Sequence, residues 1–501
     1  MSWRRFAGLL LGLFLLLATV AGYERPASAS PLPPQQDPFY TYSGKTPLAS
    51  ITPGTVLDTR SIQVAFGTST TPVRAEQLLY RTTGELGQPT VTVTTVLIPV
   101  TATVVPRIVD YLSFYDALGA ECDPSYTLAG GNPGAANEQQ TEVEEAFILE
   151  YLADDFIVTV PDFEGTNLEW AAGHEAGYGA LDAVKATESY LELPSATEVG
   201  LTGYSGGSIA AEWASELAPT YASSVHLVGV AEGGIPVDFA HNLDYINGSA
   251  GWSGVIPAAL VALARAYGID LTPYLSPYGD QLAQQVAQAC IGAFFGAYPG
   301  LTVQKLLKPQ DQDFLQIPAF TRVVDDLIMG SVPGHPTGPL FMAVGDSDGT
   351  GDGIMVTADV EALAHEYCAQ GVPLQFSVYQ GSDHEEAALQ FEPAAVEFLE
   401  ERFVGVPFTG GCAAVGTGNS LAPLSISSGS AASPGASPIA TDDQPAVDAG
   451  APAPGALAPG ALSPGALPAT GLPPAIPMIG ALLAVGGLIA ATTRRRATGD
   501  S

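Results

Sequence analysis

The sequence predicts an α/β fold, with a mostly parallel sheet flanked by helices and one inserted helical segment. Apolar strand-like runs alternate with helical patterns along most of the chain, whereas the interval 236–335 has helical patterns but no convincing strand. Strands that are regularly separated by helices usually pair in parallel, and the helices cover both faces of the sheet. The two patterns together predict a parallel sheet whose chain is interrupted by one helical insertion.

The alternating region runs from residue 91 to residue 403. We expect strands at 91–99, 107–114, 156–160, 199–202, 226–230, 339–344 and 374–379. We expect helices at 142–153, 175–191, 208–217, 358–368 and 393–403. Short apolar runs bounded by turn residues indicate the strands, and longer runs with a helical period indicate the helices.

The insertion at 236–335 contains helical patterns at 256–267 and 282–295. We interpret it as a helical cap, or lid, over the carboxyl edge of the sheet. A separate small helical domain is the alternative interpretation.

The N-terminal residues 1–29 have the layout of a secretory signal peptide. Arg4 and Arg5 precede an apolar run at 9–20, and the small-residue pattern Ala27-Ser28-Ala29 follows. A membrane helix is the alternative, but the apolar run is short for spanning a bilayer. We therefore expect an exported chain that begins near Ser30.

The C-terminal residues 467–501 resemble the sorting signal of Gram-positive surface proteins. An LPxTG pentapeptide at 467–471 is followed by an apolar stretch at 476–491 and by three arginines at 494–496. The resemblance implies that the tail and its arginines hold the chain in the membrane. A sortase then cuts between Thr470 and Gly471 and joins Thr470 to peptidoglycan. A simple membrane anchor at the tail is the alternative.

A low-complexity segment at 413–466 precedes this signal. It consists almost entirely of Ala, Gly, Pro and Ser with a few acids, and Pro-Gly-Ala-Leu recurs near 454, 459 and 464. Such a segment cannot bury enough apolar surface to offset its ordering entropy. We expect a disordered stalk that carries the catalytic region away from the membrane.

Removing both ends leaves 38–412, which is long enough for one large domain with an insertion. The whole chain has 52 acidic and 17 basic residues, a formal net charge of −35. A surface that binds phosphates needs the opposite sign, so nucleic acid is not an expected partner. Four cysteines, all within 38–412, allow two disulfides in an oxidising compartment and are too far apart in sequence for a zinc motif.

The strongest chemical motif is Gly203-Tyr204-Ser205-Gly206-Gly207. It has the G-x-S-x-G pattern and lies between a predicted strand and a predicted helix, which is the context of the nucleophile elbow in α/β-hydrolases. The sharp turn strains the serine, and glycines at 203 and 207 relieve clashes with neighbouring side chains. This context predicts that Ser205 is a nucleophile.

A serine hydroxyl needs a base to remove its proton, and in this fold the chain order is Ser, Asp, His. Five of the six histidines fall in a strand, in a helix, before the serine or in the insertion. Only His384 lies in a loop after the last predicted strand, so we expect it to be the base.

The orienting acid should follow the strand at 339–344. The loop that begins at Gly345 offers three aspartates, of which Asp348 has the common G-x-x-D spacing and Asp352 has the better spacing to the apolar residues 354–356. We favour Asp348 and keep Asp352 as the alternative. The loop also begins like a calcium loop, but Thr357 stands where such a loop needs its bidentate glutamate.

The chain resembles the secretory lipases of the lipase A type across 38–412. The similar stretches are Tyr115-Asp116-Ala117, Cys122-Asp123-Pro124-Ser125-Tyr126, the elbow at 203–207, Glu232-Gly233-Gly234-Ile235-Pro236-Val237 and Tyr367-Cys368-Ala369-Gln370-Gly371. The resemblance implies an oxyanion hole made by the N–H groups of Asp116 and Gly206, and a helical lid at 236–335. It also implies disulfides Cys122–Cys290 and Cys368–Cys412. The sequence departs from the family in a longer acid loop and in the added stalk and wall signal.

These features predict a cell-wall-anchored triacylglycerol lipase or carboxylesterase that acts on a lipid or other ester through an acyl-enzyme. We expect no metal or organic cofactor. A secreted peptidase or amidase on the same fold is the main alternative, because the triad alone does not separate esters from amides. A non-catalytic surface adhesin is a further alternative, although no member of the predicted triad is missing.

Overall fold

The structure of the protein is a computed structural model. It describes residues 31–66, 69–70, 73–99, 105–131, 134–408 and 410–424. The predicted signal peptide, the sorting signal with Thr470 and Gly471, and the stalk beyond Leu424 lie outside these residues. Within the described part of the chain, no helix is both long and apolar enough to cross a bilayer.

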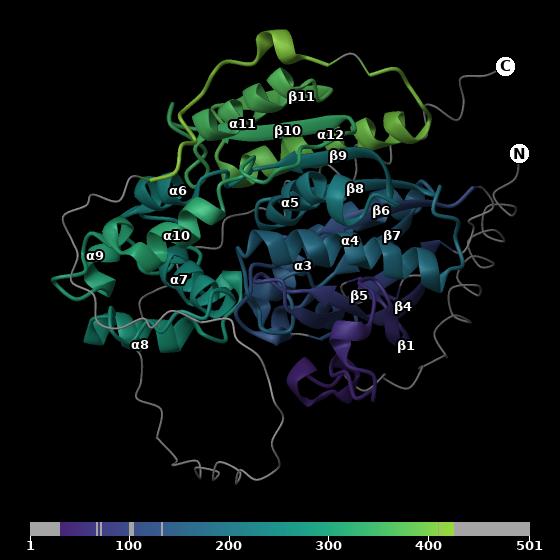
Figure 1. Cartoon of the computed structure of the whole chain (residues 1–501), viewed down its shortest axis with the longest axis horizontal. Helices are drawn as coiled ribbons and strands as arrows, with labels where there is room; N and C mark the ends of the chain where they lie inside the picture. Colours follow the sequence, from purple (N-terminus) through teal and green to yellow (C-terminus); the bar gives the residue numbers. More distant parts are fainter. Residues whose placement is uncertain are drawn as a thin grey trace, which may run out of the picture. The chain divides into compact units, whose positions relative to one another are not determined.

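One nine-stranded sheet forms the centre of the molecule, in the order β1-β4-β5-β7-β6-β8-β9-β10-β11 (Figure 1). Its strands are β1 Val56–Ile62, β4 Val73–Thr83, β5 Pro89–Pro99, β6 Arg107–Leu112, β7 Ile157–Pro161, β8 Glu198–Tyr204, β9 His226–Gly233, β10 Leu340–Asp346 and β11 Leu374–Gln380. The strands from β7 to β11 pair in parallel, and β1, β4 and β5 form an antiparallel edge. Two short strands, β2 Ala65–Phe66 and β3 Ser69–Thr70, pair with each other. The predicted mostly parallel sheet is confirmed.

The antiparallel edge was not predicted at β1 and β4, and the burial of β4 explains why. Its residues after Arg74 are all buried, including the polar Glu76, Gln77 and Arg81, so the strand shows no alternation of apolar and polar residues. Gln77 donates to the carbonyl of Ser125, and Arg81 donates to Thr83. Partners far along the chain satisfy these polar groups, and a sequence pattern does not reveal them.

Helices cover both faces of the sheet, and alternate residues of its strands divide between two apolar cores. The helices of the body are α2 Pro124–Thr127, α3 Ala135–Ala153, α4 Gly173–Tyr190, α5 Gly206–Tyr221, α11 Thr357–Gln370 and α12 His384–Phe403. Short 3-10 turns are Pro34–Gln36, Pro38–Tyr40, Leu48–Ser50, Ala120–Cys122 and Cys412–Ala414. Helices α3 and α12 share one core with strand residues such as Val109 and Phe341, and α4, α5 and α11 share the other with Leu201 and Met342. The β8–α5 turn therefore lies between two packed layers.

The cap, by which we mean residues 236–335, lies between β9 and β10. It consists of α6 Phe239–Ile246, α7 Val255–Ala266, α8 Pro277–Val286, α9 Val303–Leu306 and α10 Pro318–Asp326, with 3-10 turns Ile291–Ala293 and Phe314–Gln316. The helix expected at 282–295 is wrong in its bounds. The Ser276 hydroxyl caps α8 by accepting from Gly279 N–H, and the chain is already extended at Cys290, where it pairs with another segment.

The chain remains ordered beyond the predicted end of the catalytic region. Residues 412–424, the C-terminal strap, run along α11 and reach the cap. Gly416 N–H donates to Glu361, Asn419 bonds Ala358 and Asp359, and Leu424 N–H donates to Asp325 on α10. The expectation of a disordered stalk from residue 413 is therefore wrong for its first residues, because specific polar contacts compensate for their low apolar content.

Two disulfides are present, in the pairing that the family resemblance implies. Cys122–Cys290 joins the segment after β6 to the cap, and Cys368–Cys412 joins α11 to the strap.

Candidate active site

The turn between β8 and α5 holds Ser205 in a strained backbone conformation. Strand β8 ends at Tyr204, α5 begins at Gly206, and Ser205 between them has φ +53° and ψ −121°. A Cβ at position 203 would lie 2.2 Å from the Gly207 carbonyl oxygen, and one at position 207 would lie 1.9 Å from the Leu112 carbonyl oxygen. Glycine is therefore required at both positions for the turn to form.

His384 lies next to this serine. Its Nε2 is 2.8 Å from Ser205 Oγ, and both residues are buried. The expectation that His384 lies in a loop is wrong, since it is the first residue of α12, which Asp383 and Glu386 cap reciprocally. The Tyr204 hydroxyl donates to the His384 carbonyl oxygen at 2.7 Å, a contact that sequence reasoning missed. The cap of α12 and this hydrogen bond together fix the position of the imidazole.

The carboxylate on the other side of the imidazole belongs to Asp352. Its Oδ2 lies 2.8 Å from His384 Nδ1, and its Oδ1 accepts the N–H groups of Ile354 and Met355. The preference for Asp348 is corrected: Asp348 is exposed, accepts the N–H groups of its own turn and receives the Tyr245 hydroxyl. The turn between them, closed by pairing of Gly351 with Val356, directs Asp352 inward.

Opposing effects act on the basicity of His384. Burial alone lowers the pKa of His384, but the charge and hydrogen bond of Asp352 outweigh burial and raise it above its ordinary value. An imidazole held between a carboxylate and a serine hydroxyl can accept the hydroxyl proton, because the carboxylate stabilises the imidazolium that forms. The arrangement is suited to nucleophilic attack by Ser205.

Two backbone N–H groups lie beside the serine. Gly206 follows it directly, and Asp116 is close enough that a Cβ on Gly206 would lie 1.6 Å from Asp116 Oδ1. Among the described residues, neither N–H donates to a protein acceptor. Burial is the main cause that raises the pKa of the Asp116 carboxyl, to about 7. Free, buried N–H donors beside a nucleophile can bind an oxyanion.

An apolar cavity extends from these groups into the cap. Ser205, Gly206 and Asp116 lie at its polar part, and nearly all of the other lining residues are apolar side chains from α6, α7, α10 and the acid loop. They include Leu243, Ile246, Ile256, Ala259, Leu260, Leu263, Phe320, Val324 and Met355. Trp252 of the cap places its ring edge-on to His384, with centroids 5.3 Å apart. The cavity can hold an extended apolar group next to Ser205.

A separate polar cluster joins the body to the cap. Glu85, His174 and Asp326 bring ligand atoms to within 4.8 Å of one another, which is the only such grouping among the described residues. The Tyr267 hydroxyl lies 2.8 Å from Glu85 and 2.7 Å from Asp326, and His174 Nδ1 lies 2.9 Å from Glu85. These side chains already bind one another, so the cluster acts as a hydrogen-bonded tie between body and cap.

Comparison with known proteins gives consistent relatives. The secretory lipase family matches residues 132–411. A probable inactive lipase of Mycobacterium tuberculosis is 32% identical, over 77% of this chain and 86% of its own length. A secreted triacylglycerol lipase of Malassezia restricta is 31% identical, over 80% of this chain and 86% of its own. The crystal structure of Candida antarctica lipase A in its closed state superposes with a TM-score of 0.69 at 27% identity, and covers 75% of this chain and 88% of that one. The chain belongs to the secretory lipase family and has the α/β-hydrolase fold.

Proposed function

We propose that the protein is an exported serine ester hydrolase of the lipase type, with Ser205 as nucleophile, His384 as base and Asp352 as orienting acid. The observation that carries the proposal is the pair of 2.8 Å contacts that link Ser205 Oγ to His384 Nε2 and His384 Nδ1 to Asp352 Oδ2. They lie at the polar part of an apolar cavity.

The mechanism follows from these contacts. Ser205 Oγ attacks the ester carbonyl carbon while its proton passes to His384 Nε2, and Asp352 stabilises the imidazolium. The carbonyl oxygen becomes an oxyanion that accepts from the N–H groups of Asp116 and Gly206. The ester C–O bond then breaks, His384 gives its proton to the leaving alcohol, and Ser205 is left acylated. Water deprotonated by His384 releases the carboxylic acid and restores the serine.

The cavity favours an ester with a long acyl chain. Its lining is apolar, and burial of each methylene of a bound chain contributes about 0.8 kcal/mol. The relatives described as secreted triacylglycerol lipases support the same substrate class. The relative described as a probable inactive lipase makes activity the first property to test. All the groups that the mechanism requires are present in this chain.

Two measurements test the proposal. A fluorophosphonate probe should add its mass to Ser205 alone, and hydrolysis of p-nitrophenyl esters should rise with acyl length, while peptide anilides should be left intact. Labelling at another residue would overturn the assignment of the nucleophile. Hydrolysis of anilides in preference to esters would indicate a peptidase or amidase. Binding to surfaces without any hydrolysis would indicate an adhesin.

We propose further that the enzyme is exported and linked to the cell wall through Thr470. The support is the order of pentapeptide, apolar stretch and arginines at 467–496, after the low-complexity segment. Under this proposal the partners are sortase and peptidoglycan, and the membrane is contacted only through the signal peptide and the tail.

Cell fractionation tests the anchor. A muramidase should release the wild-type protein and mild detergent should not, whereas Thr470→Ala should reverse this behaviour. Extraction of the wild type by detergent, with the residues after Thr470 still attached by mass spectrometry, would indicate a simple membrane anchor.

A further inference from the structure

The loop that carries the Asp116 N–H holds an unfavourable backbone conformation. Residues 113–119 follow β6, and Asp116 has φ +38°, in the left-handed region that L-residues other than glycine rarely adopt. Such a conformation costs about 1–3 kcal/mol and persists only where the surroundings impose it. The contacts that impose it therefore determine where the Asp116 N–H points.

Helix α3 holds the N-terminal side of this loop. The Glu144 carboxylate accepts the Phe114 N–H and the Ser113 hydroxyl, each at 2.9 Å, and the Gln140 amide donates to the Phe114 carbonyl oxygen at 2.6 Å. Both hydrogen-bonding groups of Phe114 are thus bound to side chains of one helix.

Glu164 holds the C-terminal side. Its two carboxylate oxygens accept the Ala117 N–H at 3.0 and 3.3 Å, and its own N–H donates to the Tyr115 hydroxyl oxygen at 2.7 Å. Glu164 is 2% exposed, so the Ala117 N–H would have no solvent to bind if this acceptor were removed. Glu164 therefore contacts the residues on both sides of Asp116.

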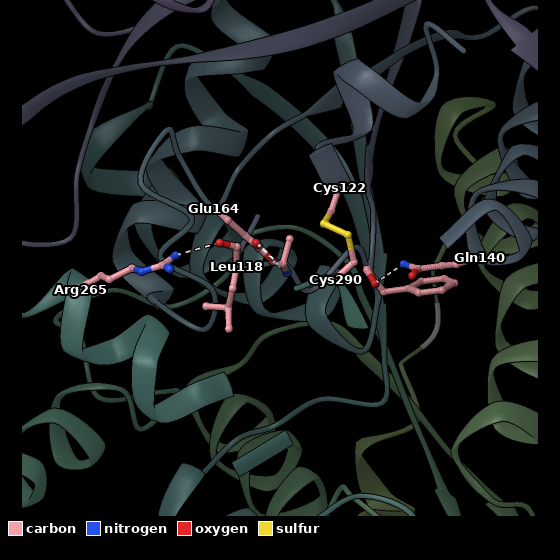
Figure 2. Close-up of a disulfide and its surroundings, with 8 residues drawn as sticks. Leu118, Cys122, Gln140, Glu164, Arg265 and Cys290 are labelled. Carbon is pink, nitrogen blue, oxygen red and sulfur yellow. Dashed lines mark hydrogen bonds between the residues drawn. A yellow bond between two sulfur atoms is a disulfide. The ribbon is translucent and has the colours of Figure 1, made fainter. Parts of the chain in front are cut away.

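The cap contributes a third contact through Arg265 of α7. Its guanidinium donates to the Leu118 carbonyl oxygen at 3.2 Å, and also to the carbonyls of Asn167, Leu168 and Ala287 (Figure 2). The Leu118 N–H donates to the Ala289 carbonyl oxygen at 2.9 Å. The nearby Cys122–Cys290 disulfide joins the same two segments covalently, as Figure 2 shows. Arg265 is the one basic residue of an otherwise apolar helix, and four backbone carbonyls provide its partners.

We infer that Glu164 and Arg265 are positioning residues for the oxyanion hole: together they hold the Asp116 N–H in place and couple it to the cap. The inference rests on the proposed ester hydrolase function and deepens it. The oxyanion of the transition state is a stronger acceptor than the carbonyl of the bound ester, while the cavity binds the acyl chain in both states. Misplacing the donor should therefore lower kcat and leave KM nearly unchanged.

The test compares Glu164→Leu with Glu164→Gln, which keeps a carbonyl acceptor for Ala117. Removal of one oxyanion donor typically lowers kcat by about 10²–10³. Glu164→Leu should approach the lower end of that range, while Glu164→Gln should stay within about threefold of wild type. Arg265→Met should lose about tenfold in kcat, because the disulfide still restrains the loop, with the exposed Arg322→Met of α10 as its matched control.

Inhibitor binding separates positioning from a general structural role. A trifluoromethyl ketone forms an oxyanion with the active serine, whereas a fatty-acid product does not. Affinity for the ketone should fall in Glu164→Leu by the same factor as kcat, with affinity for the fatty acid unchanged.

Three results would overturn the inference: kcat within twofold of wild type in both Glu164→Leu and Arg265→Met, equal losses for the ketone and the fatty acid, or failure of both variants to fold. In the last case both side chains would be needed for the fold as a whole. An inactive wild-type enzyme that takes up no fluorophosphonate would instead contradict the proposed function itself.

Discussion

The sheet-and-helix body and the cap are held together in different ways. In the body, long parallel ladders such as that of β8 with β9 and long helices on both faces hold each segment in place. In the cap, the helices have between 4 and 12 residues, and polar contacts and a disulfide connect them to the body. The body can therefore fix reacting atoms closely, and the cap can vary the wall of the cavity without disturbing them.

This difference leads to separate expectations for the two regions. Ser205, Asp352, His384 and Asp116 all belong to the body or its loops, whereas most of the apolar lining belongs to the cap. Changes at the reacting groups should reduce the rate for every ester. Changes in the cap lining should reduce it according to the substrate.

The largest effect is expected in the body at the nucleophile. Ser205→Ala should lower turnover by about 10⁶ for short and long esters alike, as loss of a triad nucleophile does in other enzymes. The unfolding temperature should not fall, because a hydroxyl is removed from a strained turn without loss of apolar packing. Kinetics with two ester lengths and thermal unfolding provide the measurement, with the exposed Ser223→Ala as control. Substantial activity remaining in Ser205→Ala would place the nucleophile elsewhere.

The next effect separates the two aspartates of the acid loop. Asp352→Asn should lower turnover by about 10⁴, because an amide no longer stabilises the required His384 tautomer and its imidazolium. Asp348→Asn serves as the matched control and should stay within about threefold, since Asp348 only accepts bonds within its turn and from Tyr245. The opposite result would restore Asp348 as the orienting acid.

A smaller, substrate-dependent effect is expected in the cap. Ala259 of α7 lines the cavity, and Ala259→Phe should fill part of it. For a long-chain ester, kcat/KM should fall by about 10–100-fold, equivalent to a few buried methylenes, while an acetate ester should be hydrolysed nearly as before. The acetate ester is the internal control. An equal loss for both esters would show that the cap also sets the geometry of the reacting groups.

The smallest effect concerns the tie between body and cap at His174. Burial lowers the pKa of His174, but Glu85, by hydrogen bond and charge, and the charges of Asp326 and Glu216 outweigh it and raise the pKa above its ordinary value. The ring also packs on Trp213. A raised folded-state pKa stabilises the protein fully below the unfolded value of about 6.5, and that contribution is lost as the pH rises through the folded value.

Thermal unfolding of wild type and His174→Gln tests this sign. The wild type should exceed the variant by about 2 °C at pH 5.5, and by less at pH 8.5. A difference that grows toward high pH would show that His174 acts in its neutral form. Activity toward short esters should be unchanged in the variant, because His174 does not line the cavity.

Local patterns predicted much of the body. The parallel strands and most of the helices lie within a few residues of their predicted positions, because burial on both faces gives short apolar runs that the sequence shows directly. The start of α12 was missed, since Pro393 resembled a first helical residue. The actual start is the capping box at Asp383 and Glu386. The ordered strap was missed as well, because its contacts with α11 and α10 join residues far apart in the chain.

The sequence by itself determined the strand-to-helix turn at Ser205, because that turn depends on five consecutive residues and on glycines where a Cβ would clash. It also singled out His384 by its position after the last strand. Only the tertiary structure decided between Asp348 and Asp352. Both lie in the same loop, and the path of that loop depends on Tyr245 of the cap, on the pairing of Gly351 with Val356 and on where α12 presents His384. The choice of acid is a relation between segments distant in sequence, which spacing within one loop cannot encode.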